Sequence, residues 1–179
     1  MTRTHLRLAF TAILAAYGLA CLLHPERGWL LSGVDLAVHE TGHLVFAPFG
    51  ELTGFLGGTL LQLIMPLVFV GYFVRRADRY AASVALWWVA QNLWNVGVYA
   101  ADARAEELPL VGGGEHDWAY LLGSIGWLRH DAAVGRAFHF AGALVYLAAI
   151  CWGLAAAADR ADPSRLTTDL AEPPFPPPA

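Results

Sequence analysis

Five long apolar segments divide the chain, separated by short polar or glycine- and proline-containing stretches. They cover residues 6–23, 30–49, 54–74, 80–101 and 132–158. An α-helix needs roughly 20 apolar residues to cross about 30 Å of hydrocarbon, and the segments are near that length. Their hydrophobicity is continuous rather than alternating, and their length favours helices over strands. The pattern therefore predicts an all-α bundle with about four or five membrane-embedded helices.

Two further stretches differ from these segments. Residues 117–128 are shorter and mixed, and they carry the aromatic residues Trp118, Tyr120 and Trp127. Such amphipathic rings gather at membrane interfaces, so a short interfacial helix is expected here. From residue 159 the chain becomes rich in proline, which predicts a disordered tail over 159–179. The membrane-embedded domain is accordingly expected to comprise residues 1–158.

The composition agrees with a membrane location. The chain is 57% hydrophobic, has a mean hydropathy of +0.47 and carries only 15% charged residues. Soluble domains carry about a quarter charged residues, so a soluble globule is disfavoured. We expect a multi-pass integral protein of a bacterial-type cytoplasmic membrane, with the lipid bilayer as its main partner. No phosphate-binding loop or nucleic-acid-binding surface is evident.

The second apolar segment is interrupted by polar residues and has signals for both helix ends. Ser32 and Asp35 have the spacing of a capping box, which predicts a helix that begins near Gly33. Pro48 disfavours helical geometry at Ala47, so the helix should end there. Fifteen residues extend about 22 Å, which is short of a full crossing. A partly inserted, re-entrant helix is therefore predicted.

The arginines favour the same topology, because cytoplasmic loops are enriched in basic residues. If the second segment does not cross the membrane, three groups of arginines lie on the cytoplasmic side. They are the N-terminal arginines, those near residue 75 and those of the tail. Seven arginines then lie inside (Arg3, Arg7, Arg75, Arg76, Arg79, Arg160 and Arg165) and four outside (Arg27, Arg104, Arg129 and Arg136). All eleven basic residues are arginine.

The polar residues of the second segment include the motif His39-Glu40-Thr41-Gly42-His43, an H-E-x-x-H sequence. Residues four apart lie on one face of a helix, so both imidazoles can bind one metal ion. The glutamate between them is then placed to accept a proton from a water activated by the metal. Imidazole ligands suit Zn²⁺ well, although iron, cobalt or manganese also accept them.

A catalytic zinc site usually has three protein ligands, so a third must come from elsewhere. The strongest candidates follow three consecutive glycines at residues 112–114, where the backbone can approach a site closely. They are His116 and Asp117, with Glu115 as a weaker candidate. One of these side chains is expected to complete the site, and the sequence alone does not separate a ligand from a partner that orients one.

Polar residues also line one face of the fourth apolar segment. Asn92, Asn95, Tyr99 and Asp102 are spaced three, four and three residues apart, which is a helical stripe. Such groups are costly in lipid and should face the protein interior or a hydrated cavity. They either line a substrate cleft, where Tyr99 or an amide stabilises an oxyanion, or join helices by hydrogen bonds.

An H-E-x-G-H helix in a small, all-helical membrane protein resembles the site-2 protease family of intramembrane zinc metalloproteases. The resemblance covers residues 35–118. It implies His39 and His43 as zinc ligands, Glu40 as general base, and cleavage of transmembrane peptide segments. That family usually takes its third ligand from a later Leu-Asp-Gly motif, which this chain lacks, and Asp117 is its positional analogue. The chain also has no room for the inserted domain of many members, so the resemblance is to a divergent or minimal member.

Three functional hypotheses follow from these observations. The leading one is a membrane-embedded zinc metallopeptidase that hydrolyses peptide bonds of a membrane protein or peptide in or near the bilayer. The alternative is a metal-binding membrane protein without hydrolysis, such as a carrier or a sensor, which needs the ligands but not Glu40 as a base. The third is a helical scaffold in which the motif occurs by chance.

Overall fold

The computed structural model describes residues 2–110 and 114–159, and all regular structure in these two stretches is helical. The all-α prediction is thus confirmed. Two of the three glycines, Gly112 and Gly113, and the proline-rich tail from residue 160 lie outside the described residues. The helices are α1 (Arg3–Leu23), α2 (Ser32–Phe46), α3 (Glu51–Arg75), α4 (Arg79–Ala101), α5 (Asp117–Ser124) and α6 (Asp131–Ala158), with two short 3₁₀ turns, η1 (Ala47–Phe49) and η2 (Leu128–His130).

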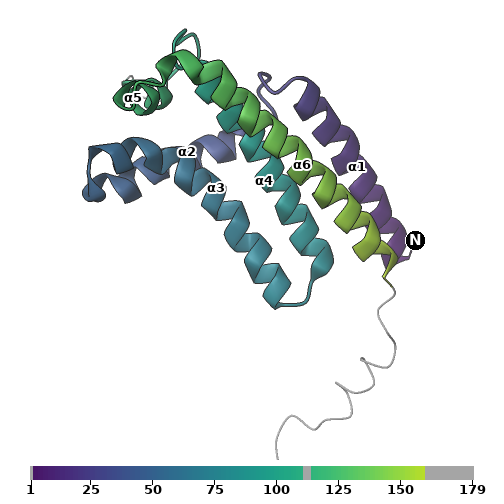
Figure 1. Ribbon diagram of the computed structural model, residues 1–179. Helices are drawn as coiled ribbons and strands as arrows, with labels where there is room; N and C mark the ends of the chain where they lie inside the picture. Colours follow the sequence, from purple (N-terminus) through teal and green to yellow (C-terminus); the bar gives the residue numbers. More distant parts are fainter. Residues whose placement is uncertain (1, 111–113, 160–179) are drawn as a thin grey trace, which may run out of the picture.

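Helix α4 is the central element of the bundle, and it packs against α1, α3 and α6 (Figure 1). Its buried face contributes Trp87, Ala90 and Trp94 to a core that also includes Cys21 and Tyr146 from α1 and α6. Because α4 is enclosed by protein, the polar groups along it can be satisfied by neighbouring helices rather than exposed to lipid. This explains why the most enclosed helix is also one of the more polar ones.

Helix α2 lies across the bundle rather than along it (Figure 1). It contains 15 residues and ends at Phe46, after which Pro48 sits inside the 3₁₀ turn η1. The predicted capping box is wrong: Leu31 precedes the helix, and no side chain caps it. The Ser32 hydroxyl accepts a hydrogen bond from the Trp29 backbone N–H instead. Asp35 is buried and accepts a hydrogen bond from Trp88 of α4, 2.8 Å away.

Contacts between distant segments define one end of the bundle. The Tyr80 hydroxyl, at the start of α4, donates to the backbone carbonyl of Arg7 in α1. Arg79 forms an ion pair of 3.0 Å with Asp159, just after α6. The start of α1, the α3–α4 connection and the end of α6 therefore lie together, as Figure 1 also shows. The connection between α4 and α5 and the start of α6 lie at the opposite end, where Arg104 pairs with Asp131.

Three stretches of helix are long and apolar enough to cross a membrane, which indicates a membrane protein. They are Arg3–Leu23, Glu51–Arg75 and Leu128–Ala158. Helix α4 has a similar length but is interrupted by Gln91, Asn92 and Asn95. Large apolar side chains are exposed along these helices, among them Ile13, Val68 and Phe140. Such exposure is unusual for a soluble protein and ordinary for a surface that faces lipid.

Glycines allow α2 and α3 to approach each other closely enough to position the motif helix. A Cβ added at Gly42 would meet the Gly57 backbone, and one added at Gly57 would meet Phe46 Cβ at 2.6 Å. The same is true at Gly58, where an added Cβ would lie 2.5 Å from His39 Nε2. Small residues are the usual means by which membrane helices reach backbone contact. The α2–α3 hairpin therefore has no space for side chains at these positions.

Candidate metal centre

Three side chains from two separate parts of the chain converge beside the start of α5. His39 and His43 lie one helical turn apart on α2, and Asp117 is the first residue of α5. The two Nε2 atoms lie 2.9 Å and 3.2 Å from the same carboxylate oxygen, Asp117 Oδ2. One potential ligand atom from each residue falls within 4.8 Å of the others. The arrangement is thus a three-ligand cluster of the type that can hold a metal ion.

The other nitrogen of each imidazole is engaged by an acceptor, which fixes the direction of the ring. His43 Nδ1 donates to the Gly54 carbonyl at 2.8 Å. His39 Nδ1 lies 3.0 Å from Gln62 Oε1, and Gln62 Nε2 donates to Asn95 Oδ1. Since Gln62 uses its amide group as a donor toward Asn95, its oxygen accepts from His39. The Nε2 atom of each ring therefore faces Asp117, and it would offer its lone pair to a metal ion once its hydrogen is lost, as in metal sites where an outer partner orients each histidine.

The dimensions of the cluster suit a tetrahedral ion. Ligands held at about 2.0–2.2 Å from zinc in tetrahedral geometry are roughly 3.4 Å apart. The distances between the Asp117 oxygen and the two nitrogens are close to that value. His39 and Asp117 are buried, whereas His43 is about one quarter exposed. The three ligand atoms together lie within 4.8 Å of one another, so the side chains would draw closer around an ion that keeps an open fourth position.

Electrostatics link the three side chains even without an ion. Burial by itself would raise the pKa of Asp117, but hydrogen bonds and charge from His39 and His43 outweigh burial and hold this pKa below its usual value. The hydrogen bond to Asp117 is the main cause that raises the pKa of His43 to about 9, against partial desolvation. The charge of Glu40 acts on His43 in the same direction. The pocket thus already favours positive charge, which a divalent cation would supply.

The other candidates for the third ligand lie outside the cluster. His116 is fully buried, but its Nδ1 accepts a hydrogen bond from the Ala119 backbone N–H and so caps α5. Its Nε2 faces Asp102, 3.5 Å away, on the side opposite the cap. Glu115 is exposed and borders a cavity beside the cluster. Of the three residues predicted as candidates, Asp117 alone joins the two motif histidines within the described residues.

Glu40 stands between two cavities that flank the cluster. One has a volume of about 260 Å³ and is bordered by His39, Gln62 and Asn95. The second has a volume of about 420 Å³ and is bordered by His43 and Asp117. Glu40, Tyr99 and Leu110 border both. An extended molecule could therefore occupy both cavities and pass the cluster, with the Glu40 carboxylate beside it.

Tyr99 is the member of the polar α4 stripe that reaches the cluster. Its ring is 5.8 Å from that of His39 in edge contact, and its hydroxyl accepts a hydrogen bond from the Asp117 backbone N–H at 3.3 Å. Asn92 instead donates to the Trp88 carbonyl, and Asp102 accepts from two backbone N–H groups of the following loop. Asn95 joins α4 to α3 through its hydrogen bond with Gln62, and the predicted cleft and oxyanion role of Tyr99 stays a prediction.

The partners that orient the histidines were not assigned from the sequence. Asp35, one turn before His39, is a natural candidate, but it bonds Trp88. The partner is Gln62, which stands alone as a polar amide in the apolar α3. Gln62 is a lone amide in an apolar helix, four residues after the Gly57–Gly58 pair. That position is the sequence signal that could have identified Gln62 as the partner of His39. The Gly54 carbonyl that holds His43 has no comparable signal, because every residue has a backbone carbonyl.

Comparison with known proteins adds no family assignment. The chain matches no family model, no curated protein and no solved structure. Inferences about function therefore depend on the residues and geometry of this chain.

Proposed function

We propose that the protein is a membrane-embedded zinc metallopeptidase that hydrolyses peptide bonds in or near the bilayer. One observation carries the proposal: His39, His43 and Asp117 converge beside Glu40, which borders cavities on both sides of them. A binding site for metal alone has no need of a carboxylate that borders such cavities. The resemblance of the H-E-x-G-H helix to site-2 proteases supports the same reaction class.

In this proposal His39, His43 and Asp117 would hold the ion, which would supply Lewis acidity and activate a water for attack. Glu40 accepts the proton that the attacking water loses and passes it to the leaving amine. The Tyr99 hydroxyl, which lies beside Asp117, would donate to the oxygen on which negative charge develops. Gln62 and the Gly54 carbonyl keep the two imidazoles aligned throughout.

Metal removal tests the proposal directly. Purified protein in detergent should cleave members of a library of fluorogenic single-span peptides. Chelation should abolish that cleavage, and one equivalent of Zn²⁺ should restore it, because the ion is needed to activate water. Cleavage that persists after complete removal of metal would contradict the proposal. Stoichiometric zinc binding with no cleavage of any peptide would favour the carrier or sensor alternative.

We further propose that α1, α3, α4 and α6 cross a bacterial-type cytoplasmic membrane and that α2 enters it without crossing. The clustering of the start of α1, the α3–α4 connection and the end of α6 at one end of the bundle supports this arrangement. It brings the arginine-rich segments to one face, as the positive-inside rule requires. A topology reporter fused after Arg79 should report from the cytoplasm. An external signal would overturn the four-crossing topology.

A further inference from the structure

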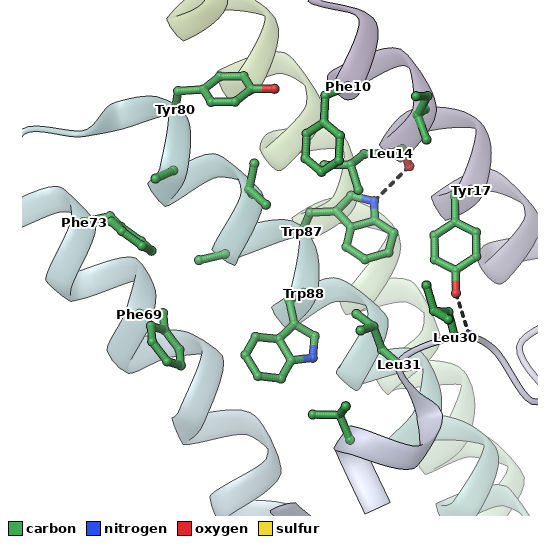
Figure 2. A pocket seen from close by; sticks show the side chains of 15 residues that line it. Phe10, Leu14, Tyr17, Leu30, Leu31, Phe69, Phe73, Tyr80, Trp87 and Trp88 are labelled. Carbon is green, nitrogen blue, oxygen red and sulfur yellow. Dashed lines mark hydrogen bonds between the residues drawn. The ribbon is translucent and has the colours of Figure 1, made fainter. Parts of the chain in front are cut away.

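A large groove lies away from the metal cluster. It has a volume of about 870 Å³ and lies between α1 and α3, over the face of α4. Figure 2 shows Phe10 and Leu14 on one wall, Phe69 and Phe73 on the other, and Trp87 and Trp88 on the floor. Cavities of 300–1,000 Å³ are the size that proteins use for small ligands and cofactors.

The groove has an apolar lining, and the polar atoms of its side chains are hydrogen-bonded within the protein. The indole N–H of Trp87 donates to the Leu14 carbonyl at 3.0 Å, and that of Trp88 donates to Asp35. The Tyr17 hydroxyl accepts from the Leu30 backbone N–H, and Tyr80 donates to a backbone carbonyl of α1. Four polar aromatic side chains that border the groove thus have their polar atoms engaged by the protein. An occupant must therefore be hydrocarbon where it lies along the groove.

Two arginines lie near one end of the groove. Arg7 precedes Phe10 and Leu14 by three and seven residues, so it continues their stripe on α1. Arg76 follows Phe73 and Phe69 by three and seven residues, and it extends their stripe just past the end of α3. The two guanidinium groups lie over aromatic rings, at 4.9 Å from Tyr80 and 5.6 Å from Tyr72. Among the described residues, neither forms an ion pair with a carboxylate, unlike Arg79.

We propose that the groove binds an anionic phospholipid, with an acyl chain along Trp87 and Trp88 and the phosphate at the mouth marked by Arg7 and Arg76. A hydrocarbon-lined slot that ends in unpaired guanidinium groups matches both parts of such a molecule. A neutral apolar helix would leave the two charges without a partner. The acyl chain would also contact Val34 of α2 and Leu31, the residue before this helix, so the lipid would brace the helix that carries the histidines.

Lipid retention tests this site without any need for catalysis. Native mass spectrometry of detergent-purified full-length protein would compare phosphatidylglycerol with phosphatidylcholine of the same acyl chains. A basic residue near a membrane surface contributes about 1 kcal/mol to anionic-lipid binding, so two arginines should favour phosphatidylglycerol by roughly tenfold or more. R7Q/R76Q should remove this preference. The matched variant R75Q/R129Q changes net charge equally and should keep it, since Arg75 lies off the stripe and Arg129 lies at the other end.

A groove-filling variant tests the acyl-chain part independently. Ala81 borders the groove from α4, and Ala81→Phe should lower phosphatidylglycerol retention several-fold while both arginines remain. Circular dichroism would verify that each variant keeps its helical content. Equal retention of the two lipids by wild type, or equal loss in the two arginine pairs, would overturn the proposal. So would a dimer without retained lipid, because a second chain would then fill the groove.

Discussion

Replacing Asp117 with alanine is expected to remove the metal from the protein while the two motif histidines remain. Asp117 Oδ2 is the atom on which both Nε2 nitrogens converge, so its loss leaves two ligands where a catalytic zinc site needs three. Elemental analysis of detergent-purified protein should show about one equivalent of zinc in wild type. We expect roughly a tenth of that or less in Asp117→Ala after dialysis against a weak chelator.

His116→Asn is the matched control for this experiment. His116 adjoins Asp117 and is also buried, but it caps α5 and faces Asp102. Asparagine is a favoured N-cap residue, so the substitution keeps the cap and removes the imidazole. The variant should therefore retain zinc at the wild-type level. Zinc lost from His116→Asn and retained by Asp117→Ala would show that the ligand set inferred from the structure is wrong.

Glu40→Gln is expected to retain metal and to lose turnover. The substitution keeps the size and polarity of the side chain but removes the carboxylate that accepts the proton of the attacking water. General-base catalysis contributes about 10²–10⁴-fold, and kcat should fall by that order. Peptide cleavage and zinc content measured on the same preparation separate the two effects. His39→Ala serves as the comparison, since this variant should lose both its zinc and its peptide cleavage.

The same variant separates the enzyme from a carrier or sensor. A carrier needs the three ligands but has no step in which Glu40 takes a proton. If cleavage of a confirmed peptide substrate is unchanged in Glu40→Gln, the general-base assignment is wrong even if zinc is essential. If zinc content falls together with cleavage, Glu40 acts through the metal site rather than on water. Retained zinc with lost cleavage is the outcome that the proposed mechanism requires.

The helices could be predicted from the sequence because their signals are local. Continuous apolar segments predicted α1, α2, α3, α4 and α6, and the shorter mixed stretch over 117–128 predicted α5. Pro48 predicted within a residue where α2 ends. The spacing of His39 and His43 placed two ligands on one helical turn for the same reason. The capping prediction at Ser32 and Asp35 failed because tertiary packing intervened. The Asp35 carboxylate accepts a hydrogen bond from Trp88 of α4, and the Ser32 hydroxyl accepts one from the Trp29 backbone N–H.

The choice among Glu115, His116 and Asp117 could not be made from the sequence. All three are adjacent and all are able to bind metal, so spacing alone does not distinguish them. The start of α5 decides between them: with His116 as its cap, successive side chains point in different directions, and Asp117 faces α2. The hydrogen bond from His39 to Gln62 could not be predicted for a related reason, since it depends on how closely α3 approaches α2.

The sequence by itself determined an apolar, all-helical chain with a short motif helix that carries two histidines and a glutamate between them. These features follow from helical periodicity and hydrophobicity, which act over a few residues. The tertiary structure alone decided which later side chain meets the histidines, what orients them, and that a carbon-lined groove remains between α1 and α3. Each of these depends on contacts between residues far apart in the chain. Close approach at Gly42, Gly57 and Gly58, for example, brings α2 against α3, where His39 meets Gln62.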